Sequence, residues 1–269
     1  MVKIISAVGF KGGIAKTSSS MMIAYTLAKK GYKTLLVDMD AQANLTGLAL
    51  RTKLAQEGQD ADTQIDSSLM KAVQDEDLTE AEIQIMDNLY LIGSSMDFSL
   101  YPDYMEQKFD SQKERVQYFS KLLDPVALKY DYCIIDTPPS LSIYLASALY
   151  ASDYALCLMK TDTFAYEGLD NLLQHIQNTV INTYGAPRLQ PLGILPVMLQ
   201  KGSLDKGILE MTNQKYGEDT VLPIVQYSSR MNRYGTTGVT DHGYFDKKPH
   251  KMYDKVTDEI LKRVNDDEQ

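Results

Sequence analysis

The chain of 269 residues is 44% hydrophobic, contains two cysteines and carries a formal net charge of −9 at pH 7. No apolar run approaches the roughly 20 residues that span a bilayer, no signal peptide precedes the first predicted strand, and two cysteines make neither a disulfide framework nor a zinc pattern. Membrane-spanning and disulfide-rich secreted proteins are excluded, and because no linker or internal repeat divides the chain, we expect one cytoplasmic domain over residues 1–269.

The negative charge is concentrated in one segment. Residues 56–88 hold ten acidic residues and one base, Lys71, so the rest of the chain is close to neutral. Residues 225–263 hold eight basic and five acidic residues. We therefore expect an acidic insertion over residues 52–88 and a mildly basic C-terminal region, which is compatible with a DNA-binding surface.

Residues 9–18, G-F-K-G-G-I-A-K-T-S, lie between a predicted buried strand, Val2–Val8, and a predicted helix, Thr17–Lys30. A strand, a glycine-bearing turn and a helix form a phosphate cradle, because backbone amides and the positive end of the helix dipole converge there. In such a cradle Lys16 would contact the β- and γ-phosphates, and the Thr17 hydroxyl would ligate Mg²⁺.

The match to the general P-loop pattern, G-x-x-x-x-G-K-[ST], is incomplete because Phe10 and Ala15 replace its two glycines. A tight turn that carries lysines is the alternative interpretation. The stretch resembles more closely the deviant Walker A motif of the ParA/MinD family, K-G-G-x-G-K-[ST]. The residues at the matching positions are Lys11, Gly12, Gly13, Lys16 and Thr17. We expect Ala15 to be tolerated, because a residue entering a helix has negative φ.

The resemblance implies ATP and Mg²⁺ as cofactors and assigns roles around the loop. Lys11 would be the signature lysine that reaches the nucleotide of the partner subunit in an ATP-sandwich homodimer. The Ser18 hydroxyl would contact the α-phosphate. The nucleotide contacts carried over in this way are Gly12, Gly13, Ile14, Ala15, Lys16, Thr17 and Ser18.

A second buried strand is predicted over Thr34–Val37, followed by D-M-D-A-Q at residues 38–42. Carboxylates at the C-terminal end of a strand lie at the sheet edge where α/β proteins bind ligands, although such acids are also common helix caps. The ParA/MinD family carries D-x-D-P-Q here. By this resemblance Asp40 would position the attacking water and Asp38 would support Mg²⁺, while Ala41 replaces the proline of the family.

The middle of the chain is predicted as short elements. Residues 52–66 are polar and acidic and indicate a loop, and short helices are predicted over Ser67–Gln74 and Thr79–Asp87. A short strand follows at Leu89–Ile92. A Ser-x-x-Glu capping box opens a further helix over residues 111–129.

Tyr132–Asp136 forms a third buried strand, within the sequence C-I-I-D-T-P-P. The Asp136 carboxylate would hold a water of the Mg²⁺ shell, as in a Walker B motif. A strand that ends in Asp is common, but D-T-P-P is typical of the ParA/MinD family. The remaining predicted elements are helices at 140–151, 164–184 and 204–216 and strands at Tyr154–Met159, Leu192–Val197 and Val221–Val225. This alternation predicts a doubly wound, mostly parallel α/β sheet flanked by helices.

Residues 228–234, S-S-R-M-N-R-Y, resemble a family loop whose preceding strand end packs on the adenine. By this resemblance Gln226 and Tyr227 are the adenine contacts, and Arg230 matches an arginine associated with DNA binding. The candidate phosphate contacts are the basic residues Arg230, Arg233, Lys247, Lys248 and Lys251.

A terminal helix is predicted over residues 249–264, with an apolar stripe at Met252, Val256, Ile260 and Val264. Such a helix binds membranes in MinD relatives, but an interfacial helix needs a basic polar face. This one carries Asp254, Asp258 and Glu259, so we expect it to dock on the sheet.

The resemblance covers nearly the whole chain and is to short ParA proteins without a helix-turn-helix domain. It implies a P-loop ATPase, weak without its partner, that partitions DNA from plasmids or chromosomes in the nucleoid. The ATP-bound dimer would bind DNA non-specifically, and a ParB-like centromere-binding protein would stimulate hydrolysis and release. The alternatives are a MinD-type membrane-associated positioning ATPase and a metabolic enzyme on the same scaffold, either a ligase or an electron carrier. The carrier would need exposed cluster cysteines, whereas Cys133 and Cys157 lie in predicted strands.

Overall fold

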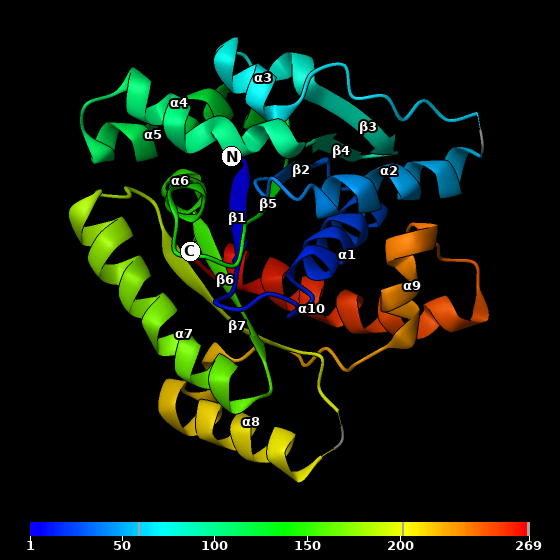
Figure 1. Cartoon of the computed structure of the whole chain (residues 1–269). Coiled ribbons are helices and arrows are strands. Elements are labelled where there is room, and N and C mark those ends of the chain that lie inside the picture. Colours follow the sequence, from blue (N-terminus) through cyan, green and yellow to red (C-terminus); the bar gives the residue numbers. More distant parts are fainter. Residues whose placement is uncertain (59, 201, 268–269) are drawn as a thin grey trace.

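The computed structural model describes residues 1–58, 60–200 and 202–267, and they form a central seven-stranded sheet with the order β3-β4-β2-β5-β1-β6-β7 (Figure 1). Neighbouring strands are parallel except for β3 and β4, which are antiparallel. The strands are β1 (Lys3–Val8), β2 (Thr34–Asp38), β3 (Glu82–Met86), β4 (Leu89–Ile92), β5 (Tyr132–Asp136), β6 (Tyr154–Lys160) and β7 (Gln190–Val197). The predicted doubly wound α/β fold is confirmed.

Helices cover both faces of the sheet, because successive residues of its buried strands point to opposite faces. In β1, Ile5 and Ala7 pack into the core on one face and Ile4 into the core on the other. The helices on the first face are α1 (Lys16–Lys29), α2 (Asn44–Glu57), α9 (Ser229–Thr237) and α10 (Lys247–Asp266). The helices on the second face are α3 (Leu69–Gln74), α4 (Tyr101–Lys108), α5 (Gln112–Ala127), α6 (Ile143–Ala151), α7 (Thr163–His175) and α8 (Ser203–Tyr216).

Short helical turns link these elements. A π-helical segment, η3 (Ile176–Thr183), continues α7 and gives the long helix predicted for this region. The 3₁₀ turns are η1 (Thr79–Ala81), η2 (Met96–Leu100), η4 (Glu218–Thr220) and η5 (Tyr244–Asp246). The predicted capping box is also confirmed, because the Ser111 side chain accepts a hydrogen bond from the backbone N–H of Glu114 at the start of α5.

Two predictions for the acidic segment are wrong. The predicted loop over 52–66 begins too early, because α2 continues to Glu57. The predicted helix over Thr79–Asp87 is only the turn η1 followed by strand β3. The sequence E-I-Q-I-M of β3 alternates polar and apolar residues, which places Ile85 in the core and pairs Ile83 with Leu91 of β4.

The predicted strand Val221–Val225 is also wrong. The structure has two isolated bridges there, Ile194 with Val221 and Leu199 with Gln226. Pro223 lies between the two bridges, and because proline has no N–H to donate, it interrupts a ladder. The segment still runs along β7 and covers its outer edge, with hydrogen bonds from Leu222 N to Ile194 O and from Val225 N to Pro196 O.

The C-terminal helix α10 docks on the sheet as predicted. Its apolar residues Tyr253, Val256, Ile260 and Val264 are buried in the core beside α1. The apolar stripe is therefore used inside the fold. Among the described residues, no helix combines the length and the apolar character that a membrane span requires.

Candidate nucleotide-binding site

The loop between β1 and α1 has the backbone shape of a phosphate cradle. Strand β1 ends at Val8 and α1 begins at Lys16. Gly13 has φ of 73°, and a Cβ added at Gly12 or Gly13 would meet no atom within 4 Å, so the space beside the loop is open. Positive φ is what glycine allows and other residues resist.

The expectation for Ala15 is wrong. Ala15 is the N-cap of α1 and has φ of 57° and ψ of 26°, in the left-handed region, rather than the negative φ of a residue already in the helix. The loop must reverse direction immediately before the helix begins, and Ala15 takes the bend. A left-handed conformation costs a non-glycine residue about 1–2 kcal/mol. The alanine therefore strains the phosphate loop.

Ala15→Gly is expected to stabilise the nucleotide-free protein by up to about 1 kcal/mol. The relief of about 1–2 kcal/mol exceeds the roughly 0.4–1 kcal/mol that the freedom of glycine costs in the unfolded chain. Denaturant unfolding measures the change. The control is Ala55→Gly inside α2, which should destabilise by about 0.5–1 kcal/mol. Equal decreases in stability for both variants would show that Ala15 is not strained.

Lys16 is the first residue of α1, and its side chain is only 8% exposed. Burial lowers the pKa of its ammonium group, and the nearby carboxylates of Asp136 and Asp40 oppose this change. Lys16 therefore lies close enough to both acids for their charges to favour its protonated form, and both acids were predicted to belong to the same site.

Asp136 lies at the C-terminal end of β5, between β1 and β2, in register with Ala7 on one side and Asp38 on the other. Its Oδ2 accepts a hydrogen bond from Thr17 Oγ1 at 2.8 Å, and its Oδ1 accepts one from Ser20 Oγ at 2.9 Å. The structure therefore joins the predicted Walker B carboxylate to the hydroxyl that follows Lys16. Ser20 was not predicted, because it lies outside the motif. It reaches Asp136 only because it is one helical turn after Lys16 in α1.

Asp38 is fully buried at the end of β2 and is held by α2. Its Oδ2 accepts hydrogen bonds from Thr46 N and Thr46 Oγ1, both at 2.8 Å, and its Oδ1 accepts one from Asp40 N at 3.1 Å. Thr46 Oγ1 in turn accepts a hydrogen bond from Ser94 N at 2.9 Å. The sequence did not indicate Thr46 or Ser94, because they reach Asp38 only where α2 and the segment after β4 meet the end of β2.

The two neighbouring buried carboxylates are costly to ionise. Burial and repulsion from Asp136 raise the pKa of Asp38 to about 7, although Thr46 donates hydrogen bonds to it. Burial raises the pKa of Asp136 to about 6, against the opposing effect of Lys16. The site therefore favours a cation, whose charge would offset this cost.

Asp136→Asn is expected to stabilise the nucleotide-free protein by about 2–3 kcal/mol at pH 8, because the raised pKa means that ionising the buried carboxyl destabilises the fold. The gain should shrink as the pH falls through about 6 and nearly vanish by about pH 3, where the wild-type carboxyl is protonated in both states. Unfolding at pH 5 and pH 8 measures it, with Asp87→Asn in an exposed turn as the control. A gain that does not change with pH would contradict the raised pKa.

Asp40 is half-buried, in the loop that leads into α2. Its Oδ1 accepts a hydrogen bond from Gln42 N at 2.9 Å, which is a local turn and not the helix cap considered as the alternative, because α2 begins at Asn44 with Ala43 as its N-cap. One carboxylate oxygen thus fixes the loop, and the acid lies close enough to Lys16 to affect its pKa.

The oxygen atoms at this edge suit Mg²⁺. The hydroxyl of Thr17 and the carboxylates of Asp136 and Asp38 are hard donors, and Mg²⁺ uses few protein ligands together with waters and phosphate oxygens. The bond between Thr17 and Asp136 places a hydroxyl and a carboxylate 2.8 Å apart. The donor set fits the ion that the resemblance implies.

Lys11 points to a different partner from Lys16. Its Nζ lies 3.7 Å from Asp162 Oδ1 and 5.1 Å from the centre of the Phe164 ring, at the start of α7. Asp162 also pairs with Lys160 at 3.3 Å. The Lys11 side chain remains 47% exposed. It is therefore held at the surface of its own subunit, where a second chain can reach it.

The structure does not join the predicted adenine contacts to the phosphate loop by any described contact. Gln226 is half-buried and lines a hollow with lysines of α10. Tyr227 is 42% exposed, its backbone N–H donates to Leu199 O, and its hydroxyl accepts a hydrogen bond from Asn232. Their role stays a prediction.

The candidate DNA contacts differ in whether their side chains are paired within the fold or exposed. Arg230 and Arg233 lie on α9, which was predicted only as a loop. Arg230 forms an ion pair with the buried Asp246, and its Nη2 donates to Thr240 at 2.8 Å. Arg233 is exposed. The remaining exposed candidates, all in the first two turns of α10, are Lys247, Lys248 and Lys251.

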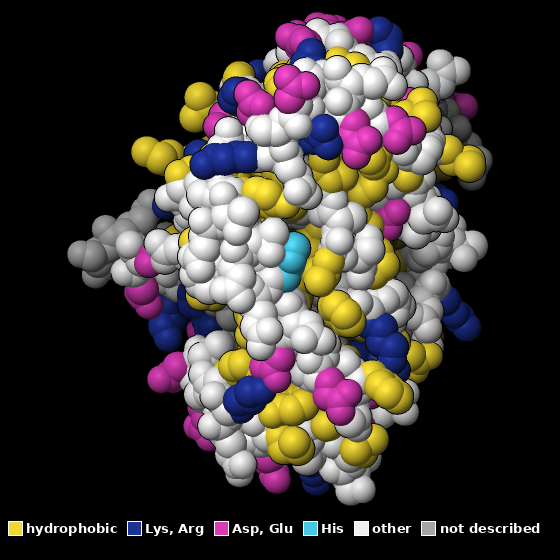
Figure 2. Space-filling view, turned by 60° about the vertical axis from the view of Figure 1, so that its left-hand side comes forward, with side chains coloured by type: hydrophobic (Ala, Val, Ile, Leu, Met, Phe, Trp, Pro, Cys, Tyr) yellow, Lys and Arg dark blue, Asp and Glu magenta, His cyan; other side chains and the backbone are white. Residues whose placement is uncertain are grey.

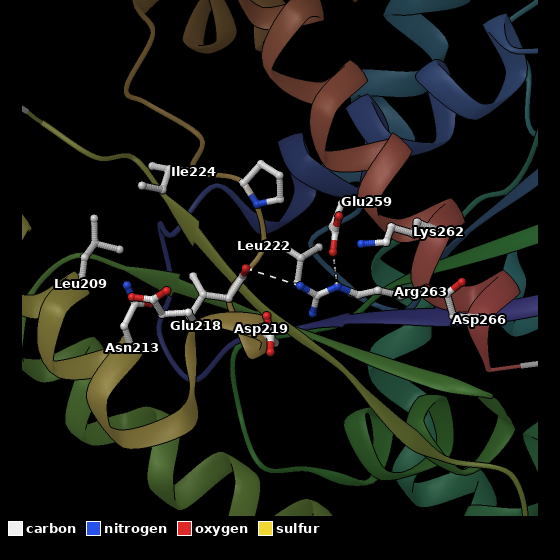
Figure 3. A pocket seen from close by; sticks show the side chains of 12 residues that line it. Leu209, Asn213, Glu218, Asp219, Leu222, Ile224, Glu259, Lys262, Arg263 and Asp266 are labelled. Carbon is white, nitrogen blue, oxygen red and sulfur yellow. Dashed lines mark hydrogen bonds and ion pairs between the residues drawn. The ribbon is translucent and has the colours of Figure 1, made fainter.

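A hollow of about 780 Å³ lies elsewhere, between α8 and the second half of α10 (Figure 3). Arg263 crosses it and donates to Leu192 O at 2.9 Å, while Glu259 accepts from its Nε at 2.8 Å. None of the predicted site residues is among the 12 that line it. This hollow is a feature of helix packing apart from the phosphate loop.

Comparison with known proteins places the chain. The AAA domain family designated AAA_31 matches residues 2–187. A ParA family protein of Chlamydia pneumoniae is 34% identical over 200 residues, which cover 74% of this chain and 71% of that protein. The chain belongs to the ParA family. The matched region contains the phosphate loop, Asp38, Asp40 and Asp136, so the family assignment and the site rest on the same residues.

Solved structures extend the similarity of this ParA-family chain over its whole length. A plasmid partition protein from Borrelia burgdorferi, bound to AMPPNP, is 25% identical, has a TM-score of 0.77, and covers 97% of this chain and 98% of its own. A cobyrinic acid a,c-diamide synthase from Mycobacterium smegmatis, with ADP and magnesium, is 21% identical with a TM-score of 0.76, covering 98% and 96%. The latter shares the fold alone, so the scaffold also serves metabolic chemistry.

Proposed function

We propose that this ParA-family ATPase is an ATP-dependent DNA-partition switch. ATP with Mg²⁺ joins two subunits in a sandwich dimer, the dimer binds DNA non-specifically, and a ParB-like centromere-binding protein stimulates hydrolysis and release. The protein then acts in the cytoplasm, on the nucleoid. The observation that carries the proposal is the different setting of the two loop lysines: Lys16 is buried against Asp136, and Lys11 is exposed.

The chain's own residues define the steps of this cycle. The open loop around Gly12 and Gly13 binds the phosphates of the nucleotide, and Lys16 neutralises them. Mg²⁺ would be held by Thr17, with Asp136 and Asp38 orienting its waters, and would balance charge on the transferred phosphoryl group. Asp40 orients the attacking water from the half-exposed loop.

Two observations favour DNA over a membrane as the surface that is bound. The apolar stripe of α10 is buried in the core and so is not available to enter a bilayer. Exposed bases gather instead at the start of α10 and on α9, namely Arg233, Lys247, Lys248 and Lys251. On the face turned forward in Figure 2, basic and acidic side chains are interspersed, which does not suit a phosphate backbone.

The test of the proposal is binding of a random-sequence duplex with and without ATP, over a range of salt. We expect binding only with ATP. In Arg233→Ala or Lys251→Ala, the log–log salt slope should flatten by about 0.9 for each phosphate that the variant no longer neutralises. The control is Lys215→Ala on α8, which pairs with Asp170 and should leave the slope unchanged. DNA affinity that is independent of ATP, or equal in all variants, would reject the proposed switch.

A further inference from the structure

Two aromatic rings project from the turn that precedes α10. Tyr244 and Phe245, in η5, are 79% and 72% exposed. They contact each other edge to face, with ring centres 5.5 Å apart and an interplanar angle of 85°. Burying such a ring would stabilise a fold by about 1.5–3 kcal/mol. The fold leaves both rings exposed, although α10 begins only three residues after Tyr244 and two after Phe245.

The turn that carries the rings is held in place by the residue that follows them. The next residue, Asp246, is fully buried. Its Oδ2 accepts hydrogen bonds from Gly243 N at 2.9 Å and Thr240 Oγ1 at 2.8 Å, and its Oδ1 accepts one from Tyr234 at 3.0 Å. Arg230 completes the set as an ion pair. These four contacts hold the backbone of the turn in the conformation that exposes the rings.

Positive charge surrounds the rings. Lys247 Nζ lies 6.0 Å from the centre of the Tyr244 ring. A hollow of about 550 Å³ is walled by both rings, Tyr227, Lys247 and Lys248. A second hollow, of about 400 Å³, shares the two lysines. The combination of exposed rings and cations around a concave surface is typical of proteins that bind single strands.

The acidic residues near the rings are already paired or belong to a neighbouring hollow. Asp241 pairs with Lys29 at 2.8 Å, and Asp246 pairs with Arg230. Asp254 lines a separate hollow on the α1 side of α10. The surface that faces the rings is therefore positive, which suits a polyanion.

We propose that Tyr244 and Phe245 stack on unpaired bases while Lys247 and Lys248 hold the flanking phosphates. The surface then prefers single-stranded or locally unstacked DNA to a fully stacked duplex. This inference rests on the proposed function and adds the chemical form of DNA that is bound. Every base has a π-face, so stacking of this kind tolerates any sequence. A concave slot also suits a planar base better than it suits the flat surface of a bilayer.

The test uses the full chain with AMPPNP and a single-stranded oligonucleotide that contains 2-aminopurine. In Tyr244→Ala/Phe245→Ala, we expect affinity to fall about tenfold for each ring removed, with the salt slope unchanged and with less quenching of the 2-aminopurine fluorescence in the complex than for the wild type. Lys247→Ala/Lys248→Ala should flatten the salt slope on the single strand by about 1.4 in log–log units. Tyr244→Phe, which keeps the ring, should bind like the wild type.

The outcomes separate the inference from the proposed function. If the wild type binds DNA with nucleotide but the ring variant binds single strands equally well, the inference is overturned and the partition switch stands. If the wild type binds no DNA in any form, both are overturned. If the ring variant loses binding only to vesicles of anionic phospholipid, the rings contact a membrane, and the inference is again overturned. Exposure of both rings lets the variant fold, which thermal unfolding verifies.

Discussion

Replacing Lys16 by alanine is expected to weaken ATP binding about ten- to a hundredfold, whereas replacing Lys11 should leave binding to the monomer nearly unchanged. Lys16 is buried at the start of α1 and would make a charge-assisted contact to the phosphate of a bound nucleotide, of the kind that contributes about 1.5–3 kcal/mol. Lys11 is half-exposed and pairs with Asp162, whereas Lys16 is affected by Asp136 and Asp40.

The effect of Lys11→Ala should appear on dimerisation. Two facing nucleotides would each lack a neutralising cation, so ATP-induced association, hydrolysis and DNA binding should fail together. Calorimetry measures nucleotide affinity and light scattering measures mass. Lys160→Ala is the matched control, because Lys160 shares Asp162 with Lys11 but has no role in the proposed cycle. A Lys11 variant that still dimerised with ATP and hydrolysed it normally would contradict the sandwich mechanism.

Replacing Asp40 by alanine is expected to reduce ATP turnover about a hundredfold or more while leaving Mg²⁺ and phosphate contacts in place. The ATP-bound dimer should therefore accumulate. Phosphate release measures turnover, and light scattering measures the dimer.

Asp40 also fixes its loop by accepting a hydrogen bond from Gln42 N, so a second variant separates the two roles. Asp40→Asn keeps an oxygen that can accept this hydrogen bond but removes the charge. If both variants lose turnover, the carboxylate acts on water. If the asparagine variant turns over ATP at the wild-type rate, the residue only fixes the loop and the catalytic assignment is wrong.

The sheet and the positions of the site residues could be predicted, because both depend on local patterns. Continuous apolar runs indicated β1, β2 and β5, and parallel strands present their C-terminal ends at one edge. Asp38 and Asp136 therefore had to lie at the same edge, and the structure pairs them in register.

What could not be predicted depends on contacts between distant segments. Thr46 reaches Asp38 only because α2 packs back over the end of β2. The Asp246 partner of Arg230 lies 16 positions along the chain, so the sequence offered Arg230 as a free cation. Ala15 shows the opposite case. Its left-handed backbone is local, but it is set by the path of the loop rather than by the preference of alanine.

The position of β5 has a consequence for the order in which the protein can fold. Strands β1 and β2 are close in sequence but do not touch, because β5 lies between them and pairs with both. The bond between Thr17 and Asp136 joins residues 119 positions apart. Contacts of such long range are slow to form, because the loop between them must close first. A nascent chain that ends before β5 therefore has the phosphate loop but not Asp136, the carboxylate that binds Thr17, so the site cannot be completed until half of the chain is made.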